Sequence, residues 1–120
     1  MNDDESLERG VALHRQMFGA DQADRPRSPR WARWAKAVLY GELWSSDKLD
    51  LRTRSLITIA ILASQSRPEQ LALHVRGAVS NGATSDEIVE AIQQAGFYAG
   101  WANGTASLTV ADKVLTELGL

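Results

Sequence analysis

The segment at residues 56–63, LITIAILA, is apolar nearly all the way round a helix, and this constrains the fold more than any other feature. A helix with one apolar stripe needs cover on one side, whereas this helix needs neighbours on every side. In a chain of 120 residues, five other short helices can cover it only in part. We therefore predict that neighbouring subunits supply the remaining cover. The alternative is a compact monomer built around one central helix.

The rest of the chain also has helical periodicity, and no stretch alternates apolar and polar residues as a strand would. Asp50 is expected to cap the apolar helix. The sequences SRPE at 66–69 and TSDE at 84–87 have the capping-box form, and Gly82 is expected to end the helix between them. Residues 20–29 contain two prolines and predict a loop. The expected helices span about residues 3–18, 30–43, 51–65, 68–81, 85–99 and 103–118. The prediction is a single all-α domain, a bundle of about six helices over residues 1–120.

Composition excludes several classes of function. The chain has no cysteine, so disulfides, zinc–thiolate sites and thiol catalysis are ruled out together. Its acidic start is unlike a signal peptide, and no apolar run reaches the ~20 residues of a membrane span. We therefore expect a cytoplasmic protein with no membrane partner.

A formal charge of −2 argues against a dedicated nucleic-acid binder. Residues 25–36 are a possible exception, because five basic side chains alternate there with Trp31 and Trp34. This pattern fits a basic, aromatic surface for nucleic acid. It also fits a solvated helix face with the tryptophans turned inward, and the net charge favours this second interpretation.

Four side chains are candidates for chemistry on position alone. His74 lies mid-helix among apolar residues, where an imidazole that titrates near neutrality can move a proton, although such a histidine is more often a core residue. Glu42 ends an aromatic-rich helix and is otherwise a solvent-facing carboxylate. Arg52 and Arg54 open the apolar helix at the end that disfavours cations, which indicates an anionic partner for them. His14 is expected at the surface, and two distant histidines make no metal site.

Several motifs in order then carry a resemblance. LRTRSLITIA at 51–60, LHVRGA at 73–78, NGAT at 81–84 and YAG at 98–100 resemble the carboxymuconolactone decarboxylase family. EI at 87–88, GELW at 41–44, LERG at 7–10 and FG at 18–19 extend the match over nearly the whole chain, weakest at 20–37. The resemblance implies an all-helical, alkylhydroperoxidase D-like subunit that assembles into homotrimers or homohexamers.

The family has two chemistries, and the resemblance separates them. Members of the peroxidase branch use Cys-x-x-Cys followed by a histidine, but the matching positions here are Arg67 and Gln70. Their assisting carboxylate would fall near Ser55. The resemblance therefore implies the decarboxylase branch, which acts in aromatic catabolism. That branch releases carbon dioxide from a small carboxylated lactone without metal or organic cofactor.

The decarboxylase branch also suggests roles for individual residues. Arg54 would grip the substrate carboxylate, His74 would donate the proton, and Glu42 would orient His74 or relay its proton. Trp44 and Tyr98 would form a water-excluding wall. Gln94 and Asn81 complete the expected substrate-binding set.

Three positions depart from the pattern of the decarboxylase branch. Gln94 stands where a histidine is usual, Ala102 where a proline is usual, and Ser80 replaces the first of two asparagines. Glutamine forms hydrogen bonds but transfers no proton at neutral pH. Gln94 therefore favours an alternative, a proton-transfer enzyme such as an isomerase or cyclase that releases no carbon dioxide. A second alternative is a helical module that binds a small ligand without turnover.

Overall fold

The computed structural model describes residues 2–19 and 27–120, so the predicted loop at 20–29 lies largely outside the described residues. This part of the chain is helical and contains no strand, which confirms the all-α prediction. It divides into two compact units, Met1–Leu51 and Arg52–Leu120. The single domain over 1–120 stays a prediction. None of the described helices combines the length and the apolar character that crossing a membrane requires.

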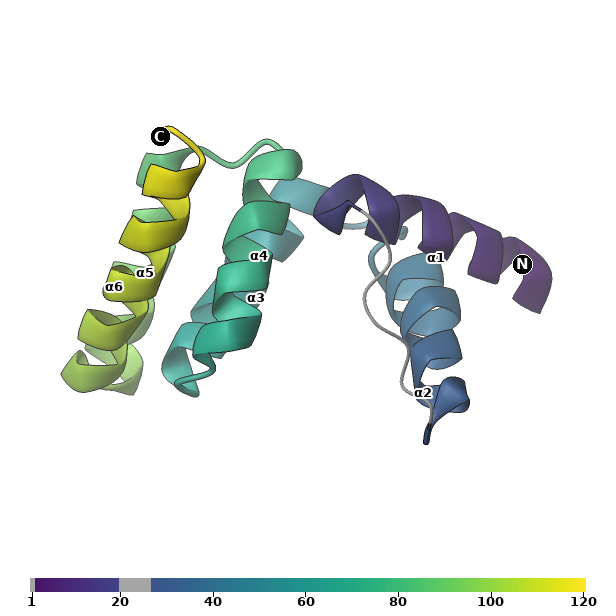
Figure 1. The fold of residues 1–120 in the computed structure, drawn as a ribbon, viewed down its shortest axis with the longest axis horizontal. Helices are drawn as coiled ribbons and strands as arrows, with labels where there is room; N and C mark the ends of the chain where they lie inside the picture. The colour runs from purple at the N-terminus through teal and green to yellow at the C-terminus, as the bar shows by residue number, and fades with distance from the viewer. Residues whose placement is uncertain (1, 20–26) are drawn as a thin grey trace. The chain divides into compact units, whose positions relative to one another are not determined.

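The first unit contains α1 (Asp3–Phe18), α2 (Pro29–Trp34) and a π-helix, η1 (Ala35–Leu43) (Figure 1). The Asn2 side chain caps α1 by accepting a hydrogen bond of 2.8 Å from the Glu5 backbone N–H. α1 packs closely on η1 at Gly10, where an added Cβ would overlap the carbonyl oxygen of Lys36. The core between the two helices consists of buried residues of both and of the residue after η1: Leu13, Met17, Tyr40 and Trp44.

Two expectations for this unit are wrong. Residues 30–43 were expected to form one α-helix, but from Ala35 onward the chain forms π turns. At the end of this segment the backbone N–H of Trp44 accordingly donates to the carbonyl of Leu39, five residues earlier, as in a π turn. His14 is buried rather than at the surface, with its ring edge-on to the rings of Phe18 at 5.0 Å and Tyr40 at 5.3 Å.

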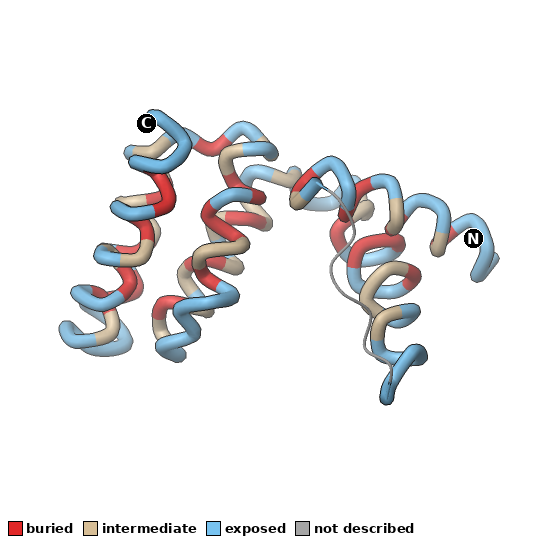
Figure 2. Tube along the Cα trace, in the orientation of Figure 1, coloured by how far each residue is buried: buried red, intermediate tan, exposed pale blue. Residues whose placement is uncertain are grey.

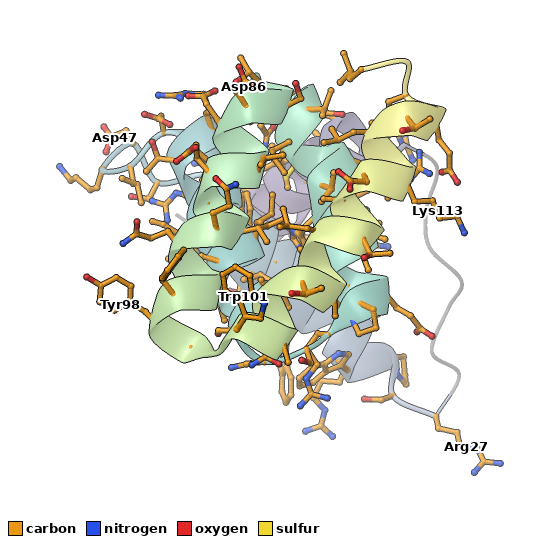
Figure 3. All side chains as sticks on the ribbon, turned by 90° about the vertical axis from the view of Figure 1, so that its left-hand side faces the viewer. Arg27, Asp47, Asp86, Tyr98, Trp101 and Lys113 are labelled. Carbon is orange, nitrogen blue, oxygen red and sulfur yellow. The ribbon has the colours of Figure 1, made fainter. Side chains whose placement is uncertain are left out.

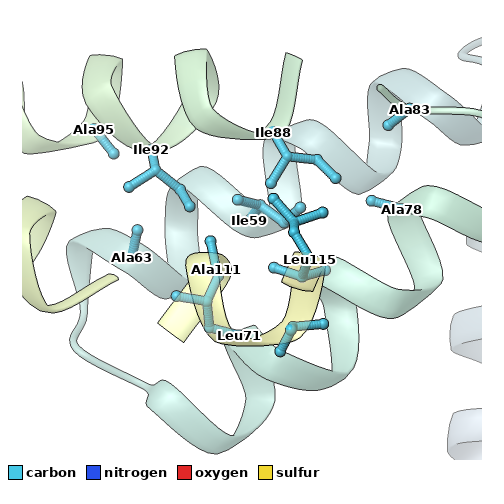
Figure 4. Packing of buried hydrophobic residues seen from close by; sticks show 12 residues of the cluster. Ile59, Ala63, Leu71, Ala78, Ala83, Ile88, Ile92, Ala95, Ala111 and Leu115 are labelled. Carbon is cyan, nitrogen blue, oxygen red and sulfur yellow. The ribbon is translucent and has the colours of Figure 1, made fainter. Parts of the chain in front are cut away.

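The second unit packs four helices around one apolar core: α3 (Leu51–Ser64), α4 (Pro68–Ser80), α5 (Ser85–Ala99) and α6 (Trp101–Glu117). Buried positions line the inner sides of these helices, as Figure 2 shows. Isoleucine, leucine, valine and alanine side chains fill the core (Figure 4). Ile59 of α3 is fully buried there, whereas Ile57 and Ile61 stay about half exposed. Part of the apolar surface of α3 is therefore left uncovered by the described residues.

The two predicted capping boxes have different outcomes. The Thr84 hydroxyl accepts from the backbone of Glu87, and the Glu87 carboxylate accepts from the backbone of Thr84, which confirms the box at α5. The box at α4 is wrong: Arg67 is the N-cap and makes no side-chain cap, while Ser66 has φ 52° and donates its hydroxyl to Asn103 of α6. The Ser66 hydroxyl, which the local pattern assigned to the cap, is instead bonded to a residue distant in the sequence.

The helix ends around α5 differ in how well they were predicted. Gly82 follows α4 with φ 93°, as expected for a left-handed terminator. α6 begins at Trp101, two residues earlier than expected, because Gly100 with φ 131° ends α5 and turns the chain at once.

Candidate functional site

His74 is the titratable side chain placed deepest in the described part of the second unit. It lies mid-way along α4, only 7% exposed, and its helix neighbour Val75 belongs to the apolar core. Burial lowers the pKa of His74 to about 4, because a low-dielectric environment disfavours the charged imidazolium. The sequence predicted titration near neutrality, and the structure corrects this: the imidazole is neutral at pH 7 in the free protein.

Asn81 follows His74 by two helical turns, so both extend from the same side of α4. The Asn81 amide nitrogen donates a hydrogen bond of 3.0 Å to the hydroxyl of Ser55, which is fully buried on α3. The amide oxygen of Asn81 is also buried, and no described residue donates a hydrogen bond to it. An acceptor of this kind costs about 1–3 kcal/mol when unsatisfied, so it is a suitable contact for a donor on a ligand.

The two arginines of α3 have different surroundings. The Arg52 guanidinium forms an ion pair with Glu87 of α5, so the expected anionic partner exists for this arginine. Arg54 lies half-buried in the first turn of α3, and its backbone carbonyl accepts a 2.8 Å hydrogen bond from the Thr58 hydroxyl. The role of Arg54 as the cation for a substrate carboxylate stays a prediction.

Gln94 and Tyr98 are brought together at an open groove of about 620 Å³ between α5 and α6. Tyr98 is 86% exposed and projects away from α5, whereas Trp101 lies over the groove (Figure 3). An exposed tyrosine excludes no water, so within this chain alone Tyr98 does not form the predicted dry wall. His74 does not line this groove.

The groove also contains residues that the sequence reasoning missed. Its floor is the close crossing of Gly96 and Gly104, where a Cβ on Gly96 would lie 3.1 Å from the Cα of Gly104. Phe97 and Trp101 flank the groove with their ring centroids 5.8 Å apart. Large aromatic residues usually indicate a core, so their type alone could not place these two at an open surface.

Glu42 and Trp44 belong to the first unit, apart from the five other candidates. Glu42 is exposed near the end of η1, as the alternative interpretation of it expected. Trp44 is buried, and its ring lies 5.8 Å from that of Tyr40. Trp44 is thus part of the core of the first unit, and the pairing of Glu42 with His74 stays a prediction.

Among residues 2–19 and 27–120, no three His, Asp or Glu side chains gather as ligands for a metal ion. The chemistry that this part of the chain offers is a buried imidazole, a half-buried guanidinium and side-chain amides.

Comparisons with known proteins give a consistent result. Residues 29–113 match the model of the carboxymuconolactone decarboxylase family. The chain is 30% identical to a 4-carboxymuconolactone decarboxylase of Acinetobacter baylyi, over all of this chain and 94% of the relative. It is 27% identical to a nitrosuccinic acid decarboxylase of Metarhizium robertsii, over 93% of this chain and 82% of that protein.

Proposed function

Because the chain belongs to the carboxymuconolactone decarboxylase family, we propose that it is a carboxy-lyase that needs no cofactor and acts on a small, cyclic, lactone-type carboxylated substrate. The observation that carries the proposal is the placement of His74. In the described part of the second unit, it is the one titratable side chain among the buried residues. A buried, neutral imidazole in an apolar helix bundle is suited to moving a proton where water is excluded.

The names of both relatives support decarboxylation without a cofactor. One denotes a carboxylated lactone and the other a nitro acid, and each of these groups can take up an electron pair from a neighbouring carbon. When the bond to the carboxylate breaks, carbon dioxide leaves and the electron pair passes into the substrate itself. The remaining step is the delivery of one proton to the carbanion, which a side chain can perform.

In this mechanism the imidazole of His74 becomes protonated when the anionic substrate binds. The imidazole of the free protein is neutral at pH 7, because burial lowers its pKa to about 4. An anionic carboxylate bound nearby raises the pKa of the imidazole by favouring its charged form. His74 then passes the proton to the carbanion and returns to the neutral state.

The other candidates have binding roles in this proposal. Arg54 grips a carboxylate of the substrate, since a guanidinium pairs with it through two parallel hydrogen bonds. The buried amide oxygen of Asn81 accepts a hydrogen bond from the substrate. Gln94 and Tyr98 are the proposed contacts from α5, on the groove that His74 does not line.

The decisive experiment measures carbon dioxide release by the purified protein from a panel of carboxylated lactones and nitro dicarboxylic acids. Turnover of at least one substrate is expected, and the variant His74→Gln should lower it by ~10²–10⁴-fold, as for the loss of a general acid. His14→Gln is the matched control, because it removes the other histidine. Equal turnover by wild type and His74→Gln would contradict the proposal.

Gln94 supports a second candidate function, because it lacks the acid–base capacity of the histidine that it replaces. In that case His74 transfers a proton in an isomerase or cyclase reaction. Incubation with the same panel in deuterated water separates the two. Incorporation of deuterium without carbon dioxide release supports the second function, and ligand binding without either reaction supports a binding module.

A further inference from the structure

Ser55 of α3 is a buried residue whose hydroxyl does not bond to its own helix. Hydroxyls within helices commonly donate to the backbone carbonyl four residues earlier, as those of Thr58 and Thr105 do in this chain. Ser55 is fully buried, and within the described part of the chain its hydroxyl makes one hydrogen bond, which it accepts from the side-chain amide of Asn81. The hydroxyl of Ser55 therefore connects α3 to the end of α4.

Packing alone does not explain a serine at this position. Alanine would fill nearly the same space, has a higher helix propensity and has no polar group to remove from water. Ile59, one turn further along the same side of α3, belongs to the apolar core, where a hydroxyl is costly. The hydrogen bond to Asn81 is the described contact that offsets this cost.

The backbone of Asn81 is fixed independently of Ser55. Asn81 is the C-cap of α4, and its backbone N–H donates to the carbonyls of Gly77 and Ala78 at 2.9 and 3.1 Å. Gly82 follows with φ 93°, and a Cβ there would meet no atom within 4 Å, so open space adjoins this end of α4. The backbone leaves the rotation of the Asn81 amide group undetermined, and the 3.0 Å bond from the amide nitrogen to Ser55 fixes it.

We propose that Ser55 is a positioning residue, which holds the amide of Asn81 so that its oxygen, and not its nitrogen, is left for a ligand. The inference rests on the proposed function, in which that oxygen binds the substrate. It adds a requirement on the substrate: the group that meets Asn81 is a hydrogen-bond donor such as a hydroxyl. A carboxylate there would set two acceptors against each other. Without Ser55 the amide would turn over, and its nitrogen would meet the ligand as well.

Selective isotope labelling of the asparagine side-chain nitrogens tests the positioning by NMR without any substrate. The chain has three asparagines, so each amide can be followed separately. In Ser55→Ala the amide hydrogens of Asn81 should exchange with solvent about tenfold faster, because they lose their acceptor. Those of Asn103 donate to backbone carbonyls and should not change. Ser107→Ala removes another buried hydroxyl of this unit, and as the matched control it should alter neither signal.

A double-mutant cycle tests the connection to the substrate. Ser55→Ala and Asn81→Leu should each lower kcat/KM about five- to tenfold, mainly through KM, because Asn81 binds the substrate and moves no proton. The double variant should lose no more than Asn81→Leu alone, since Ser55 acts through Asn81. Ser107→Ala should behave as the wild type, and circular dichroism should show native helicity for every variant. If the wild type releases no carbon dioxide, the proposed function fails, and the same cycle is measured on the dissociation constants of the panel compounds.

The donor requirement is tested with pairs of cyclic carboxylic acids that differ only by a hydroxyl group. The wild type should bind the hydroxylated member of at least one pair about five- to tenfold more tightly, and Ser55→Ala should bind both members of that pair alike. Three results would overturn the inference: an unchanged Asn81 amide signal in Ser55→Ala, losses that add in the double variant, or no preference of the wild type for the hydroxylated member of any pair.

Discussion

The Glu87 carboxylate joins two parts of the second unit, with one oxygen in the cap of α5 and the other paired with Arg52 of α3. The first oxygen accepts a hydrogen bond of 2.9 Å from the backbone N–H of Thr84, and the second accepts from the Arg52 guanidinium. One residue therefore closes the capping box and ties the first turn of α3 to the first turn of α5. The capping role of Glu87 can be predicted from TSDE at 84–87. The ion pair cannot, because its two residues are 35 positions apart in the sequence.

Substitutions at this junction should separate the two roles of Glu87. Arg52→Ala removes only the ion pair, whose side chains are about 44% and 33% exposed, and should cost about 0.2–1 kcal/mol. Thr84→Ala removes a cap bond and should cost about 1 kcal/mol. Glu87→Ala removes the ion pair and also the hydrogen bond that the Thr84 backbone N–H donates to the carboxylate, so it should cost more than Arg52→Ala. Urea unfolding measures these differences, and a Glu87→Ala effect no larger than that of Arg52→Ala would contradict the dual role.

His74 makes stability depend on pH. Its pKa is about 4 in the folded protein and about 6.5 when unfolded, so between these values the unfolded state binds the extra proton. The free energy of unfolding should therefore fall as pH decreases from about 6.5 to about 4, by up to about 3 kcal/mol. In the variant His74→Gln, the free energy of unfolding should change less over this pH range than in the wild type. Parallel stability curves for the two proteins would show that this histidine is not buried in the neutral form.

Arg54 should act mainly on substrate capture. Arg54→Ala is expected to lower kcat/KM by ten- to a hundredfold or more, because it removes a charge-assisted contact to a carboxylate. Arg54→Lys should restore only part of the loss, since an ammonium cannot form the bidentate contact. Steady-state kinetics on the substrate identified by carbon dioxide release measures both. If both variants capture substrate like the wild type, Arg54 has a structural role.

Under the proposed function, Gln94 and His74 should together determine the shape of the pH–rate profile. In the free enzyme the imidazole ionises with a pKa of about 4, so kcat/KM should show an ionisation there, and kcat should show one displaced upward by the bound anion. Gln94→His restores a second acid–base group and should add a second ionisation or increase turnover. A profile that is the same with glutamine and histidine would exclude position 94 from the chemistry.

The apolar surface of α3 predicts an obligate oligomer, a trimer or a multiple of it. Ile57 and Ile61 are about half exposed on the described chain, so neighbouring copies are expected to cover them. Ile57→Glu with Ile61→Glu should dissociate the assembly in sedimentation equilibrium, while Asp86→Ala with Glu90→Ala, at exposed positions of α5, should not. A stable, folded wild-type monomer at micromolar concentration would refute this expectation.

Local signals determined where the helices lie. The spacing of apolar residues, the Asn2 and Thr84 caps and the glycine after Asn81 act within one or two turns, so the sequence alone places α1, α3 and α5 to within about a residue. Arg52 could also be recognised as a cation in need of an anion, since the helix dipole acts locally. The identity of its partner, Glu87, could not.

Only the tertiary structure decided features that depend on distant neighbours. SRPE at 66–69 and TSDE at 84–87 have the same local form, yet only the second is a cap, because Asn103 takes the Ser66 hydroxyl. Trp31 and Trp34 were expected to be turned inward, but both are exposed, since residue type does not say which side of a helix is covered. The sequence identified His74 as a group that can carry a proton. Its neutral state at pH 7 follows from the helices packed around it, because burial in a low dielectric, and not the imidazole itself, determines its pKa.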